Sequence, residues 1–168
     1  VSVPVPLGAC VVKRGSAIRS ERNLVGRTVI VARGTTNEAA MRSLASKTGS
    51  AFELQVADDF AQALARLASG AVDAVAADDV LIAGFLASKD LRGSYAMVGE
   101  PVSHEPYGIM FVQGDAPLAQ AVAAAFRRLA VTREIRWIYD KWFLRTLPSG
   151  VRLGLPMSLE LRRSFEIL

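Results

Sequence analysis

The chain has 168 residues, of which 51% are hydrophobic and 21% charged. This composition is typical of a folded globular protein and excludes a disordered or collagen-like chain, and no apolar run reaches the roughly 18 residues that span a bilayer. The net charge of +4 comes mostly from scattered arginines, so we expect no nucleic-acid partner.

The chain has one cysteine, Cys10, and one histidine, His104. These counts exclude a Cys/His zinc cluster and weaken any Ser-His-Asp proposal, so we predict no metal and no cofactor. We expect Cys10 to be a small core residue and His104 to lie in a loop just before a strand. The start, VSVPVPLGAC, lacks the basic region and long apolar stretch of a signal peptide.

Short apolar runs alternate with helical stretches through the first hundred residues. Strands are predicted at 9–12, 28–32, 52–56, 72–77 and 95–98, and helices at 37–47, from 58–59 to 70, and at 80–88. The remainder predicts a longer strand at 107–112, helices at 118–129 and 133–143, and a short helix from residue 158. Strands separated by single helices indicate an α/β fold with a mostly parallel sheet.

Ligands of such sheets bind outside the carboxyl ends of the strands, near helix N-termini. The first such place is the turn of Arg33, Gly34, Thr35 and Thr36, whose glycine, hydroxyls and free N–H groups suit a carboxylate or phosphate. The simpler alternative is that Thr35 only caps the helix, with Glu38 completing a capping box.

The second place is Asp78-Asp79, at the end of the predicted strand 72–77. One carboxylate could accept hydrogen bonds from an ammonium group while the other caps the next helix, or both could be caps facing solvent. An anion site and an ammonium acceptor at neighbouring strand ends together favour a binder of free α-amino acids.

Four segments occur in an order that resembles a known family: NLVGRTVIVARGTTNEA, FAQALARLASGAVDAVAADDVLIAG, GEPVSHEPYGIMF and a helix ending in IYDKWF. They look like the polar amino-acid-binding proteins of bacterial ABC importers (solute-binding protein family 3). The tail LPSGVRLGLPMSLELRRSF further resembles the glutamate/aspartate-binding clade.

This resemblance implies roles for six residues. Thr36, with Gly34 and Thr35 in the same turn, would hold the ligand α-carboxylate, and Asp78 would accept its α-ammonium. Phe60 stands where the glutamate/aspartate binders carry a histidine that faces the ligand side chain. An apolar ring cannot solvate a carboxylate, which argues against an acidic ligand. Arg33 could compensate by turning inward, but we expect its side chain to face solvent.

The resemblance implies a periplasmic-binding-protein-like type II fold with one complete lobe and the C-terminal part of the other. Residues 1–22 would form the incoming crossing strand and turn, 23–102 the second, smaller lobe, and 103–168 the return crossing and C-terminal helices of the first lobe. The N-terminal half of the first lobe would be absent. We therefore expect weak or no binding by this chain, and a homodimer or a rearranged C-terminal segment formed through exposed apolar helices.

The function implied is extracytoplasmic, periplasmic capture of an amino acid and its delivery to ABC permease subunits. The alternative is a ligand-sensing domain of a sensor kinase or transcription regulator on the same fold. An enzyme such as a dehydratase is a third interpretation, for which Asp79 or Glu105 would be the nearby acid/base candidates. We predict that the chain is not an enzyme.

Overall fold

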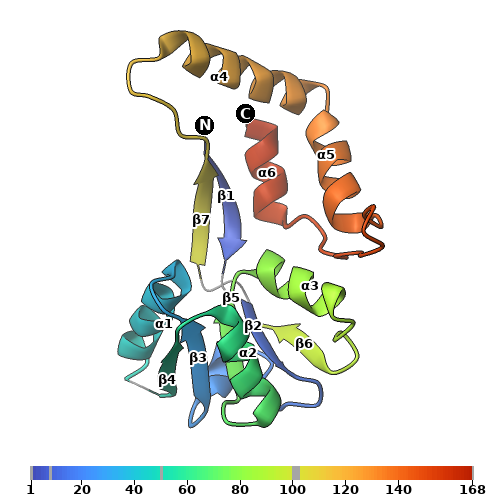
Figure 1. Ribbon diagram of the computed structural model, residues 1–168. Coiled ribbons are helices and arrows are strands. Elements are labelled where there is room, and N and C mark those ends of the chain that lie inside the picture. The colour runs from blue at the N-terminus through green and yellow to red at the C-terminus, as the bar shows by residue number, and fades with distance from the viewer. Residues whose placement is uncertain (1, 8, 50, 100–102, 168) are drawn as a thin grey trace. The chain divides into compact units, whose positions relative to one another are not determined.

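The computed structural model describes residues 2–7, 9–49, 51–99 and 103–167, which form two compact units (Figure 1). The sheet unit is Leu7–Ser103, and the helical unit consists of Val1–Pro6 together with His104–Leu168. The chain therefore passes between the units twice.

The sheet unit contains a five-stranded sheet in the order β4-β3-β5-β2-β6. Its strands are β2 Ala9–Lys13, β3 Thr28–Ala32, β4 Glu53–Ala57, β5 Ala74–Ala77 and β6 Tyr95–Val98. β3 is parallel to β4 and β5, whereas β2 is antiparallel to β5 and β6. Four strands therefore run in one direction, and β2 runs against them. Residues 9–13, assigned above to the incoming crossing, form β2 and thus lie inside this sheet.

Both faces of this sheet are covered, which explains why its strands are continuous apolar runs. On β3, Ile30 packs on one face with residues of α2 (Phe60–Ser69) and α3 (Asp79–Ser88). Its neighbours Val29 and Val31 pack on the other face with residues of α1 (Thr36–Lys47) and of the 3-10 turn Glu21–Leu24. Successive strand residues point to opposite faces, so one strand contributes to both halves of the core.

Local capping interactions set the helix ends, as the sequence predicts. Thr35 precedes α1, and its hydroxyl accepts the N–H of Glu38 at 3.2 Å. The Asp59 carboxylate accepts the N–H of Gln62 at 2.7 Å at the start of α2. Gly70 ends α2 with a φ of 82°, a left-handed conformation that glycine adopts without strain.

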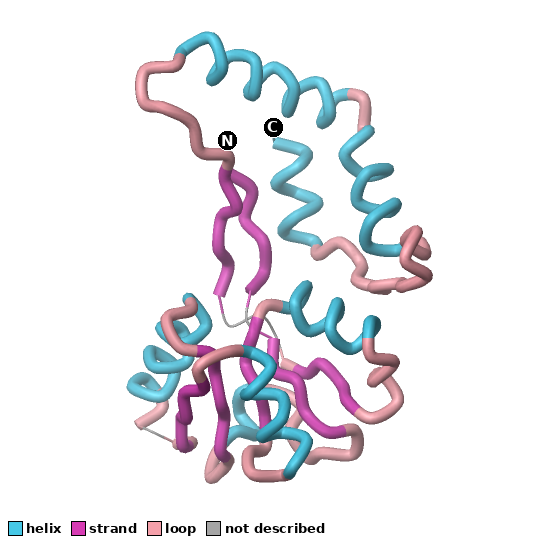
Figure 2. Tube along the Cα trace, viewed as in Figure 1, coloured by secondary structure: helices cyan, strands magenta, loops and turns pink. Residues whose placement is uncertain are grey.

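The helical unit contains α4 Ala116–Val131, α5 Glu134–Tyr139, a π-helical turn Asp140–Leu144, and α6 Leu159–Ile167. Strands β1 (Ser2–Leu7) and β7 (Ser103–Gly108) pair in a separate two-stranded sheet and run in opposite directions (Figures 1 and 2). Within the described ranges, no helix is both long and apolar enough to cross a bilayer.

Two predictions about the second crossing are wrong. The strand expected at 107–112 lies earlier, at Ser103–Gly108, and residues 109–112 form no strand. A strand needs a partner, and β7 pairs with β1, whereas the apolar pattern alone placed a strand of the same length four residues later. His104 consequently lies within β7 and not in a loop.

Candidate functional site

A pocket of about 340 Å³ lies at the carboxyl ends of β3 and β5. These strands are parallel neighbours, so the turn after β3 and the residues after β5 emerge at the same edge of the sheet. The pocket is lined by residues of both strand ends and of α1, α2 and α3: Ala32, Gly34, Thr35, Thr36, Asn37, Phe60, Ala76, Ala77, Asp78 and Leu81.

The structure therefore brings five of the six predicted site residues to one concave surface, namely Gly34, Thr35, Thr36, Phe60 and Asp78. Thr36 and Asp78 are 42 positions apart in the chain and meet only because β3 and β5 are adjacent. The role of these residues in holding a ligand stays a prediction.

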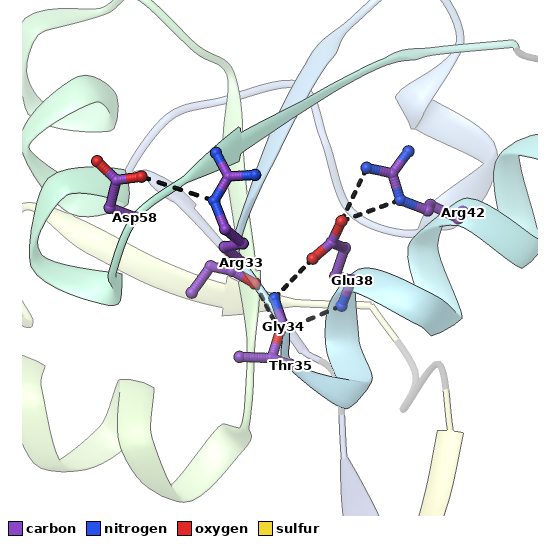
Figure 3. Close-up of polar contacts among 7 residues, drawn as sticks. Arg33, Gly34, Thr35, Glu38, Arg42 and Asp58 are labelled. Carbon is purple, nitrogen blue, oxygen red and sulfur yellow. Dashed lines mark hydrogen bonds and ion pairs between the residues drawn. The ribbon is translucent and has the colours of Figure 1, made fainter.

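The turn before α1 is stabilised by its own hydrogen bonds (Figure 3). The Thr35 hydroxyl donates to the carbonyl of Ala32 at 2.8 Å as well as accepting from Glu38. Glu38 in turn accepts the N–H of Gly34 at 2.7 Å and two hydrogen bonds from Arg42, at 2.8 and 3.0 Å. The Gly34 N–H, followed by the hydrogen bonds and charge of Arg42, lowers the pKa of the Glu38 carboxyl below its usual value.

These contacts distinguish the side chain of Thr35 from that of Thr36. Thr35 caps the helix, which was the simpler alternative for this turn. The N–H of Gly34 already donates to the Glu38 carboxylate. Within the described part of the chain, the side chain of Thr36 has no hydrogen-bond partner, and its N–H lies in the first helical turn, where such groups lack an intrahelical acceptor. Thr36 is thus the residue of the turn best placed to receive an anion.

Asp78 is held at the opposite strand end by a buried amide. Asn37 is 6% exposed, and its Nδ2 donates to Oδ1 of Asp78 at 2.6 Å. Although Asp78 precedes α3, its side chain makes no capping hydrogen bond. One carboxylate oxygen is therefore oriented by Asn37, and Oδ2 makes no hydrogen bond to another described residue.

The neighbouring Asp79 has a different environment. Its Oδ1 accepts the N–H of Val80 at 2.6 Å, and its side chain does not line the pocket. Partial burial raises the pKa of the Asp79 carboxyl, the Val80 N–H opposes this rise, and the charge of Asp78 adds to it. Of the two acid/base candidates, Asp79 is thus outside the pocket, and the side chain of Glu105 lies outside the described ones.

Arg33 does not turn into the pocket. It is not among the pocket-lining residues, and its Nε lies 3.7 Å from Oδ1 of Asp58, with both side chains mostly exposed (Figure 3). The guanidinium therefore pairs with a surface carboxylate on the chain segment after β4.

Sequence reasoning missed Asn37 and Leu81. Asn37 directly follows Thr36 in the first turn of α1, and a polar residue on the inner side of a helix that starts at a strand end is a usable signal. Leu81 carried no signal, because it reads as one more apolar residue of α3. Among the residues described, no group of three or more Cys, His, Asp or Glu could hold a metal ion.

No protein-family model matches the chain. It is 31% identical over 152 residues to the L-glutamate/L-aspartate-binding protein of Pseudomonas aeruginosa, covering 90% of this chain and 50% of that protein. It is 32% identical over 132 residues to the ABC transporter glutamine-binding protein of Bacillus subtilis, covering 78% of this chain and 46% of that protein. The chain thus spans about half the length of the curated relatives it matches.

Solved structures agree with these relatives. An ancestral arginine-binding protein bound to arginine superposes with a TM-score of 0.63 at 30% identity, covering 85% of this chain and 61% of that one. The fold is that of the type II periplasmic binding proteins. The comparisons give no support for the expected homodimer. By sequence and fold together, the chain is similar over most of its length to amino-acid solute-binding proteins of bacterial ABC importers, and it matches about half of each curated relative.

Proposed function

We propose that the protein binds a free amino acid outside the cytoplasm, in the periplasm, and delivers it to the permease subunits of an ABC transporter. The observation that carries this proposal is that Thr36 and Asp78 line one pocket. Similarity to the curated relatives supports it, since these are named for binding glutamate, aspartate or glutamine.

The chemistry of the pocket suits the two charged ends of a zwitterion. The first turn of α1 favours an α-carboxylate, because its N–H groups and the positive end of the helix dipole point toward the strand ends. Asp78 favours an α-ammonium, since a carboxylate oxygen accepts a charge-assisted hydrogen bond from it. Asn37 assists by holding Oδ1, which leaves Oδ2 for the ligand.

A binding role explains the pocket better than catalysis does. Of the described lining residues, Asp78 is the one with an ionisable side chain, and the neighbouring Asp79 does not line the pocket. General acid-base chemistry requires such a group within hydrogen-bonding reach of the reacting atom.

We expect the 168-residue chain by itself to bind weakly. Gly34, Thr35 and Thr36 are solvent-exposed in the sheet unit, and ion pairs in water contribute only about 0–1 kcal/mol. A dissociation constant in the millimolar range is therefore the expected outcome, and a method that detects weak binding is needed.

The test is an NMR titration of the ¹⁵N-labelled chain with single L-amino acids, following the backbone amide signals of Thr36 and its neighbours. Asp78→Ala should abolish the shifts because it removes the ammonium acceptor. Asp58→Ala is the control, since Asp58 is an exposed aspartate of the sheet unit that pairs with Arg33 outside the pocket. Unchanged binding in Asp78→Ala would contradict the proposal.

A further inference from the structure

The pocket has two chemically different parts. The polar part consists of the turn around Thr36 and the pair Asn37–Asp78 described above. The rest of the lining is apolar and comes from two strand ends and two helices: Ala32, Ala76, Ala77, Phe60 and Leu81.

The two large apolar residues of the lining are Phe60 and Leu81. The Phe60 ring meets the ring of Phe85 edge to face, with centroids 5.8 Å apart and an interplanar angle of 87°. Phe60 also packs against the core cluster on this face of the sheet, and this contact holds its ring in place. Leu81, in the first turn of α3, also lines the pocket and is 48% exposed, so part of its apolar surface is available there.

Charge in and around the pocket disfavours a second carboxylate. Among the described lining residues there is no Lys, Arg or His, and the single charged side chain is the anionic Asp78. The arginines nearest in sequence to the turn are engaged elsewhere, Arg33 with Asp58 and Arg42 with Glu38. A glutamate or aspartate side chain would thus lose its hydration against apolar walls without gaining a cation.

A cationic side chain fares little better. Within the described lining, Asp78 is the one acidic group, and the proposed function assigns it to the α-ammonium. A ligand guanidinium or ammonium would have only the Phe60 ring as a partner, and a cation–π contact does not replace a lost carboxylate partner in a partly apolar site.

We infer that the bound amino acid carries an uncharged side chain, and that Phe60 and Leu81 contact this side chain and select it. This inference rests on the proposed function, because it takes the Thr36 and Asp78 end of the pocket as the site of the α-carboxylate and α-ammonium. It assigns this chain a ligand class different from the acidic amino acids for which its glutamate/aspartate-binding relatives are named.

The test compares four ligands in the same NMR titration: leucine and glutamine, which are uncharged, against glutamate and arginine. Leucine or glutamine should bind at least about tenfold more tightly than both charged ligands, which corresponds to about 1.4 kcal/mol. Glutamate or arginine binding as tightly as the uncharged pair would overturn the inference while leaving the proposed function standing. If no ligand shifts the Thr36 amide, the proposed function itself fails.

Variants test the assignment to Phe60 and Leu81. Phe60→Lys and Leu81→Lys each place a cation at the apolar wall, and each should raise the affinity for glutamate relative to leucine by about tenfold. Ala61→Lys is the matched control, because it adds the same charge to an exposed position of α2 that does not line this pocket.

Leu81 is half exposed, so Leu81→Lys keeps the test valid even if Phe60→Lys loses its fold, which the amide spectrum would show. An unchanged glutamate-to-leucine ratio in Leu81→Lys would overturn the role of this wall. An equal shift in Ala61→Lys would do the same, since it would trace the effect to net charge.

Discussion

The sheet unit and the helical unit differ sharply in what they bury. Among residues whose side chains are described, every buried apolar residue but Leu161 belongs to the sheet unit. α4 and α5 contain no buried residue, and Trp137 and Trp142 are 54% and 49% exposed. A sheet covered on both faces thus forms a core within one hundred residues, whereas α4 and α5 of this chain contribute no buried residue.

This contrast explains where the candidate site lies. The strand ends of the sheet unit are anchored by fully buried residues such as Ile30 and Val75, so the side chains that follow them are held in place. The helical unit has no comparable foundation in its described residues. Three intrinsic probes report the two units separately: Trp137 and Trp142, the chain's two tryptophans, and the single Cys10 in β2.

The largest expected effect is separate unfolding of the two units in urea. Tryptophan fluorescence should change at a urea concentration lower than the main circular-dichroism transition by about 2 M or more, because burial of apolar surface dominates stability. The two signals are recorded on the same samples. Coincident transitions would show one cooperative unit and break the comparison.

Truncating one isoleucine in each unit compares their stabilities more sharply. Ile30 is 0% exposed in the core cluster beneath α2 and α3, and Ile30→Ala should cost about 2–5 kcal/mol of unfolding free energy. Ile109 in the helical unit is 54% exposed, and Ile109→Ala should change stability by less than about 0.5 kcal/mol. Urea denaturation followed by circular dichroism measures both, and equal losses would contradict the burial contrast.

Cys10 supplies a pH-dependent test of the sheet unit. Burial, with a smaller effect of the Glu21 charge, raises the pKa of the Cys10 thiol from 9.0 to about 11. The folded state therefore holds this proton more tightly than the unfolded state, so stability is full below pH 9 and falls as pH rises from 9 to 11, by up to about 2–3 kcal/mol.

Other groups also titrate above pH 9, so the comparison is with Cys10→Ala. That variant should lose less stability than the original chain between pH 9 and 11. Parallel pH profiles for the two proteins would refute the burial of this thiol, and so would rapid labelling of Cys10 by a thiol reagent in the folded state.

Asn37 tests the polar contact at the base of the pocket. Asn37→Leu leaves Oδ1 of Asp78 without its donor and should cost about 1–3 kcal/mol in urea denaturation, with weaker amino-acid binding. Gln120→Leu, an exposed amide of α4 in the helical unit, is the control and should be nearly neutral. Equal effects at the two positions would mean that the Asn37 contact does not stabilise the fold.

The smallest effect is expected at Asp79. The pKa of its carboxyl is raised in the folded state, so the folded protein prefers the protonated form. Stability therefore falls as pH rises from the ordinary pKa of an aspartate through the raised pKa of Asp79. Asp79→Asn should therefore stabilise the protein slightly at pH 7, by less than about 0.5 kcal/mol because the group is only half-buried. Thermal unfolding should show this gain at pH 7 and its disappearance near pH 3, and a loss of stability at pH 7 would contradict it.

Most elements of the sheet unit could be predicted because their signals are local. The apolar run at Thr28–Ala32 and the aromatic-led strand Tyr95–Val98 match the structure residue for residue. Thr35 and Asp59 each cap a helix through a hydrogen bond to the residue three positions later, so the helix starts could be predicted equally well. The second crossing was misplaced because the extent of β7 depends on pairing with β1, about one hundred residues away.

Only part of the candidate site could be predicted from the sequence. The hydroxyl turn at Thr36 and the acidic strand end at Asp78 could be found from residue chemistry and paired by their places at strand ends, and the family resemblance then implied a role for each. The assignment of Thr35 to capping, of Arg33 to Asp58 and of Asp79 to Val80 depends on which neighbour each side chain meets, and short motifs leave that open.

The sequence by itself determined the apolar strands, the helix starts and the kinds of polar group at the strand ends, because these follow from propensities and hydrogen bonds between near neighbours. The tertiary structure alone decided that β5 lies beside β3, opposite β4, and so brought Asn37 against Asp78 and the apolar wall of Phe60 and Leu81 beside them. Strand order is set by the packing of the whole sheet between its helices, and no short stretch of chain contains that information.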